Sequence, residues 1–171
     1  MVTDTYKDSA PEEEQRKSPG PEVAAIDYAA LNAVFGALFA AAVIAARQTD
    51  NAKSDPITGA ELIPISAATF ALAKVIAREK IGSWMREPFV DHTPDGERRP
   101  RGRRLQRAVG ELVTCTRCVG AWSALGIVGQ RMTSPQTGRM VTNVLAASAA
   151  NDWMQASFKY VTAAANRADR G

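Results

Sequence analysis

Apolar stretches alternate with polar segments along the chain, and the length of each stretch predicts an element. The first, YAALNAVFGALFAAAVIAA at 28–46, holds 19 residues without a charge between Asp27 and Arg47. As a helix it would rise about 28 Å, close to the roughly 30 Å of a bilayer core. A buried helix of this length in a soluble protein usually has a polar side, but Asn32 is the one strongly polar residue here. The stretch therefore predicts a transmembrane helix.

Three later stretches predict helices of more mixed character. The stretch at 62–84 begins with LIPISAATFALAKVIA and ends in a charged segment with tryptophan and methionine, a composition typical of the membrane–water interface. The stretch at 112–129 contains Arg117 and three glycines, and the stretch at 140–158 is the least apolar of the four. The pattern predicts an all-α, integral membrane bundle of about four transmembrane helices.

Polar segments frame these helices. Residues 1–22 hold six acidic and three basic residues with three prolines, which predicts a disordered acidic tail, and they lack the basic, then apolar order of a secretory signal. The segment at 90–107 is predicted to be a basic loop, and 162–171 a short C-terminal tail. Residues 23–161 between the tails are predicted to form one helical membrane domain, which suits a chain of 171 residues.

The distribution of lysine and arginine predicts how the helices are threaded. The five polar segments in chain order carry three, two, nine, two and three basic residues. With four crossings, the richer segments all fall on one side, which the positive-inside rule assigns to the cytoplasm. Both termini and the basic loop are therefore predicted to be cytoplasmic. The same threading brings Lys74, Arg117 and Asp152 to a similar depth, and we hypothesise that Asp152 pairs with one of the two bases because charges in a bilayer usually pair.

The range Arg98–Arg107 holds six arginines and no acid, although the net charge of the chain is only +3. The simplest interpretation of this cluster is a signal that keeps the loop on the cytoplasmic side. Such a cluster would also contact anionic lipid headgroups. Nucleic acid is disfavoured because no aromatic residues are interleaved for base stacking. The single histidine, His92, lies in the predicted loop without other ligands at metal-site spacing and is interpreted as solvated.

Cys115 and Cys118 are the only cysteines of the chain, and three interpretations of the pair stay open. Both side chains share one side of a helix and would pack against neighbouring helices beside Trp122. They would alternatively supply half of a tetrahedral zinc site, which a homodimer would complete. In the third interpretation the pair is a redox couple, in which the helix N-terminus and Arg117 favour the thiolate.

The order of AREKIGSWMREPF, a basic loop, CTRCVGAW and VLAASAANDW resembles a bacterial family of small multi-helix membrane proteins of unknown function, some of them linked to sporulation. The resemblance covers roughly 28–158, and its most specific part is the Cys-x-x-Cys pair with the glycine and tryptophan that follow. It implies a multi-pass protein of the bacterial inner membrane and no established activity.

Three common classes of catalytic site have no counterpart in the sequence. There is no nucleophile–base pair, no phosphate-binding glycine loop and no carboxylate pair placed for acid–base chemistry. We therefore predict a structural or interaction role in the membrane. The alternatives are a membrane thiol protein that uses Cys115 and Cys118 for redox exchange or metal binding, and a small transporter or channel subunit that uses the predicted charge cluster.

Overall fold

The computed structural model describes residues 23–49, 55–92, 98–168 and 170, so the predicted acidic tail at 1–22 lies outside the described residues. The described chain is mostly helical, which confirms the predicted all-α class, and it adds one two-stranded hairpin. The elements are α1 (Ala25–Gln48), η1 (Gly59–Glu61), α3 (Leu62–Ala77), η2 (Lys80–Gly82), α4 (Ser83–Arg86), β1 (Val90–His92), β2 (Arg98–Pro100), α5 (Leu105–Thr114), α6 (Thr116–Thr133) and α7 (Pro135–Ala168).

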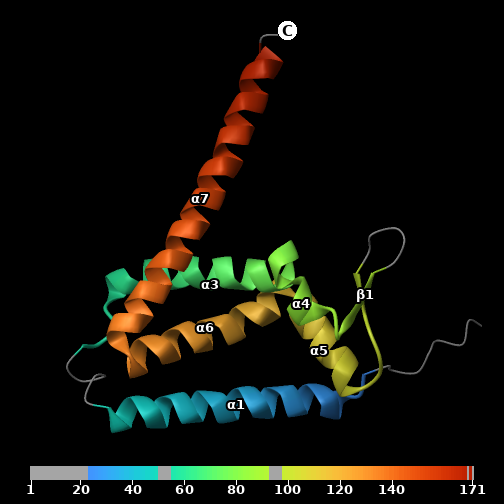
Figure 1. Cartoon of the computed structure of the whole chain (residues 1–171), viewed down its shortest axis with the longest axis vertical. Coiled ribbons are helices and arrows are strands. Elements are labelled where there is room, and N and C mark those ends of the chain that lie inside the picture. Colours follow the sequence, from blue (N-terminus) through green and yellow to red (C-terminus); the bar gives the residue numbers. More distant parts are fainter. Residues whose placement is uncertain (1–22, 50–54, 93–97, 169, 171) are drawn as a thin grey trace, which may run out of the picture.

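Three helices form the body of the molecule. Figure 1 shows α1, α3 and α6 side by side, with α4, α5 and the hairpin gathered at one end. In the contacts between elements, α3 packs on α6 and α7, and α6 also packs on α1. Helix α7 crosses α3 and α6 with its first half and then extends away from the other helices (Figure 1).

The core between α3 and α6 is built from small residues. Ala68, Ala73 and Ala77 of α3 are almost fully buried, and they meet Val119 and Ile127 of α6. Small side chains let two helix backbones approach closely, so dispersion contacts replace the bulky core of a soluble domain. The alanine-rich composition therefore places these helices in direct contact.

Two helical segments of the described chain are long and apolar enough to cross a membrane. They are Ala25–Gln48 and Gly59–Ala77, and the bent pair α5–α6 makes a third if it counts as one span. Helix α1 leaves Val34, Phe39 and other large apolar side chains exposed. Helix α7 is long but is not among the segments apolar enough to cross a membrane, so a fourth crossing at 140–158 stays a prediction.

The structure shortens the helix predicted at 62–84. Helix α3 ends at Ala77, where the carbonyl of Lys74 accepts the N–H groups of both Arg78 and Glu79, at 2.7 and 3.2 Å. The remainder becomes the short helices η2 and α4. Their turn brings Arg86 back over the end of α3, where its guanidinium donates to the carbonyls of Ile76 and Glu79.

Three other predicted boundaries also change. The segment at 112–129 is divided, because α5 and α6 meet at an 87° bend. The predicted loop at 90–107 contains the β1–β2 hairpin, with Val90 opposite Pro100, and the first residues of α5. Helix α7 is longer than predicted at both ends and continues to Ala168, so the first part of the predicted tail at 162–171 is helical.

Candidate functional site: the cysteine pair at the α5–α6 bend

Cys115 is the residue at which the chain turns from α5 into α6. Its backbone is extended, with φ −93° and ψ 106°, and it is both the C-cap of α5 and the N-cap of α6. Its N–H donates to the carbonyls of Glu111 and Leu112 at the end of α5, at 3.1 and 3.2 Å. The preceding Thr114 hydroxyl donates back to the Gly110 carbonyl at 2.9 Å, a local bond that competes with regular helix. These contacts end one helix and start the next at the cysteine.

The sulfur of Cys115 takes the position of an N-cap side chain. It accepts the backbone N–H of Cys118 at 3.3 Å and lies 2.7 Å from the Cys118 sulfur, whose thiol donates to it. Both cysteines are free, with Cys115 half-buried and Cys118 exposed. Negative charge is favoured at a helix N-terminus, where backbone N–H groups point outward. The geometry therefore stabilises a thiolate on Cys115 in particular.

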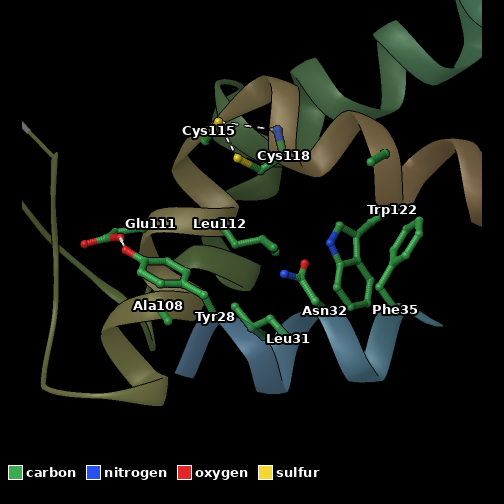
Figure 2. A pocket seen from close by; sticks show the side chains of 11 residues that line it. Tyr28, Leu31, Asn32, Phe35, Ala108, Glu111, Leu112, Cys115, Cys118 and Trp122 are labelled. Atoms are coloured by element: carbon green, nitrogen blue, oxygen red, sulfur yellow. Dashed lines mark hydrogen bonds between the residues drawn. The ribbon is translucent and has the colours of Figure 1, made fainter. Parts of the chain in front are cut away.

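The pair borders a cavity of about 500 Å³ between α1, α5 and α6. In Figure 2 the two sulfur atoms lie together at the bend, on the side of the cavity away from α1. The rest of the lining is mainly apolar, and its residues are Tyr28, Leu31, Asn32, Phe35, Ala108, Glu111, Leu112, Ala121 and Trp122. The thiols therefore face a space that suits an apolar group or chain segment better than a charged one.

The two ends of this cavity differ in character (Figure 2). At one end, the hydroxyl of Tyr28 donates to the Glu111 carboxylate. At the other, Phe35 of α1 meets Trp122 of α6 edge to face, with ring centroids 5.2 Å apart. An edge-to-face pair adds to the burial of the rings and sets the spacing of α1 and α6. Both ends therefore join α1 to the helices that carry the cysteines.

The described residues do not complete a metal site around the pair. Nowhere in the described chain do three or more histidine, cysteine, aspartate or glutamate side chains form a group that would hold a metal. Two thiolates are half of a tetrahedral zinc site. The zinc interpretation of Cys115 and Cys118 therefore still requires a second copy of the chain. The single histidine lies in β1, remote in sequence from the pair.

Of the predicted charge cluster, the structure pairs Asp152 with Lys74. Its ammonium lies 2.9 Å from Asp152 of α7 and 3.2 Å from Glu79. Arg117 lines the same cavity as Lys74, a space of about 640 Å³ between α3 and α6. Of the two bases considered for Asp152, Lys74 is the one that binds it. Each side chain of this pair is about one-third exposed, so the ion pair ties α7 to α3 at moderate strength.

A second charge cluster was not predicted from the sequence. Arg131, whose side chain is 1% exposed, binds the Glu61 carboxylate with Nε and Nη2 at 3.0–3.1 Å and Asp55 Oδ1 with Nη2 at 3.2 Å. Arg139 binds the same two acids from α7. The partners are 70 or more positions apart in sequence, and Arg131 lies between the stretches predicted as helices at 112–129 and 140–158. A basic residue one turn before the α6–α7 connection was the one available signal.

The arginine-rich segment has intramolecular partners. Arg98 donates to the carbonyls of Ala77 and Arg78 at 3.0 and 3.2 Å, so with Arg86 it covers carbonyls that the end of α3 leaves unpaired. Arg86 is 2% exposed, and burial lowers the pKa of its guanidinium, with a smaller contribution from the charge of Arg98. Arg104 approaches Asp27 of α1 at 3.6 Å. The segment therefore joins α3 and α1 to the end of the body that carries α5.

Residues 65–158 match the family described as "Protein of unknown function (DUF1360)". The chain belongs to this family. The matched region starts later than the predicted resemblance at 28–158, so it contains the cysteine pair, Lys74 and Asp152 but not α1. No curated protein and no solved structure matches the chain.

Proposed function

We propose that this member of the family is an integral membrane thiol protein in which Cys115 and Cys118 reduce disulfides beside an apolar cavity. The observation that carries the proposal is the contact between the two sulfurs at the N-terminus of α6, with Cys115 as the N-cap. A purely structural pair would be expected to bury both side chains, whereas Cys118 is exposed. The exposure of Cys118 therefore favours exchange chemistry over packing.

The two cysteines have different parts in the reaction. Cys115 attacks as a thiolate because the Cys118 N–H and the helix N-terminus favour its negative charge. It bonds to one sulfur of a substrate disulfide and releases the other as a thiolate, which takes a proton from water. Cys118 then loses its proton to water and attacks the Cys115 sulfur, which releases the second substrate thiol. The substrate gains two electrons and two protons, and small thiols of the cell reduce the new Cys115–Cys118 disulfide.

The membrane setting is supported by α1 and by the segment η1–α3. Both are long and apolar enough to span a bilayer, and α1 exposes apolar side chains rather than a polar side. The hairpin and α5, which carry the arginine-rich segment, lie at the same end of the body as the bend (Figure 1). Under the positive-inside rule this end is cytoplasmic, so the dithiol faces a reducing compartment and rests in its reduced form.

Trapping of a mixed disulfide tests the assignment of the two roles. The purified full-length protein is incubated with a small aromatic disulfide, and the adduct is measured by intact mass. We expect Cys118→Ser to retain the adduct on Cys115, because the resolving sulfur is gone. Cys115→Ser should form several-fold less adduct over the same time, and the unaltered protein should end as an internal disulfide. Equal adduct on the two single variants would refute the assignment.

Two further measurements separate the proposal from its alternatives. Zinc content of the purified protein, with the double variant Cys115→Ser/Cys118→Ser as the matched control, should be far below one ion per two chains. Labelling with a membrane-impermeant maleimide should modify the cysteines only after cells are permeabilised. Labelling of intact cells would place the pair on the oxidising side and reverse the expected direction of exchange.

A further inference from the structure

Helix α7 has one side that is covered by its own chain. The covered positions, at alternating spacings of four and three residues, are Gly138, Thr142, Leu145, Ala149 and Asp152. They face α3 and α6, and Asp152 carries the ion pair to Lys74. Gly138 sits against Arg131, where a Cβ would lie 2.4 Å from the Arg131 Cα. This side therefore fixes α7 on the body of the molecule.

The opposite side of α7 carries a heptad repeat that no other part of the described chain covers. Its positions also alternate in spacings of four and three, and all nine are exposed: Met140, Val144, Ala147, Asn151, Met154, Phe158, Val161, Ala165 and Ala168. We call this set the heptad stripe. At about 100° per residue, the stripe lies roughly half a turn around the helix from the covered side. A seven-residue apolar repeat is the pattern by which helices pair in coiled coils.

We propose that the heptad stripe is the contact through which two copies of this chain form a parallel, in-register dimer. Counting Val144 as position a makes Asn151 the next a position, and a single asparagine at a specifies register and a two-stranded state in parallel coiled coils. The two asparagine side chains would then meet on the dimer axis. The apolar members of the stripe pack above and below them.

The charges of α7 are compatible with pairing of identical chains. The flanking e and g positions from 141 to 164 are all uncharged, so the two copies bring no like charges together across the seam. Arg139, Asp152, Lys159 and Arg167 all fall at b or c positions, away from the contact. A highly charged partner would find no charged side chains to pair with along this side of the helix.

The area of the stripe meets the requirement of a specific dimer. Its five large apolar side chains, Met140, Val144, Met154, Phe158 and Val161, are 62–72% exposed. Together with the alanines and Asn151, their burial would remove on the order of 700 Å² per chain, close to the roughly 800 Å² per partner of a standard interface. The stripe spans 140–168, or about 43 Å of helix, so the contact is long and narrow, as in a coiled coil.

The position of α7 leaves room for the second copy. Figure 1 shows its distal half extending beyond the other helices, and the covered side holds the body away from the stripe. A two-fold axis along the stripe therefore directs the two bodies outward. The cavity at the cysteine pair is lined by α1, α5 and α6, so the dimer leaves it open. The alternative is that lipid alone covers the stripe. Asn151 within the stripe argues against this, because a polar side chain facing lipid is costly.

Cysteine cross-linking at single positions tests the register. In the background Cys115→Ser/Cys118→Ser, one cysteine is introduced at Met154 or Phe158 of the stripe, or at Ala163 as the matched control on the other side of α7. Membranes containing each full-length variant are oxidised briefly. We expect at least fivefold more covalent dimer from the stripe positions than from Ala163→Cys, because identical a and d positions face each other across the axis. Equal yields on both sides, or none at the stripe, would overturn the proposal.

A charge substitution tests the same contact without cross-linking. Phe158 is 72% exposed, so Phe158→Glu leaves the packing of the chain on itself intact while it puts two like charges into the seam. Native mass spectrometry of protein in lipid nanodiscs should show dimers for the unaltered chain and for Ala163→Glu, and monomers for Phe158→Glu. A monomeric unaltered chain, or a Phe158→Glu chain that stays dimeric, would show that the stripe faces lipid or solvent instead.

Discussion

The buried arginine of α6 and the exposed arginine of α7 allow one stability prediction with an internal control. Arg131 and Arg139 bind the same two acids, Asp55 and Glu61, but their side chains are 1% and 48% exposed. Removing one partner of a buried ion pair costs about 3–5 kcal/mol, because the other partner stays desolvated. Here the acids are 23–31% exposed and Arg139 still pairs with them, which reduces the cost. We expect Arg131→Ala to lower the free energy of unfolding by about 2–4 kcal/mol.

The matched substitution, Arg139→Ala, should cost roughly 0–1 kcal/mol, as exposed pairs usually do. For a chain of this size, one kcal/mol corresponds to about 2–4 °C in melting temperature. Thermal unfolding in mild detergent, followed by tryptophan fluorescence, should therefore show a loss of about 4–16 °C for Arg131→Ala and under about 4 °C for Arg139→Ala. Equal losses, or a larger one for Arg139→Ala, would refute the argument that burial sets the strength of these pairs.

Two further predictions concern how α7 is held. Gly138→Ala should lower the melting temperature by several degrees because its Cβ would lie 2.4 Å from the Arg131 Cα, whereas Gly126→Ala, with nothing within 4 Å, should be neutral or stabilising; the same melts compare them. In a double-mutant cycle of Lys74→Met and Asp152→Asn, the coupling energy should stay below about 1 kcal/mol because both side chains are about one-third exposed, and a coupling above about 2 kcal/mol would contradict this.

The hydrophobic pattern located most helices but not their interruptions. Helix α1 matches its predicted stretch within a few residues, because a long uncharged apolar segment forms few structures other than a helix. The break at Cys115 leaves no trace in the pattern, since apolar residues continue on both sides of it. At the bend, local bonds such as that from the Thr114 hydroxyl to the Gly110 carbonyl accompany the packing of α5 against β2, and neither is visible in a hydrophobic pattern.

Long-range polar contacts were predicted only where helix depth supplied a constraint. The hypothesis that Asp152 pairs with Lys74 or Arg117 followed from opposite charges at a similar depth on predicted helices, and the structure contains the ion pair with Lys74. The Arg131 cluster had no such constraint, because Asp55 and Glu61 precede α3 in a segment predicted as a loop. An acidic side chain in a loop can pair with any basic side chain at the same end of a helical bundle. Its partner is therefore decided by the final packing rather than by sequence spacing.

The limits of the family region bear on how the proposed site works. Both cysteines lie within residues 65–158, whereas the facing side of the cavity comes from α1, which precedes that region. Phe35 and Tyr28 join α1 to α6 and α5 at the two ends of the cavity. If the dithiol reacts as proposed, the region shared with the family supplies the sulfurs, and the side chains of α1 determine which substrates reach them. Substitution of Leu31 by tryptophan, which narrows the cavity from the α1 side, should then slow reaction with bulky disulfides more than reaction with small ones.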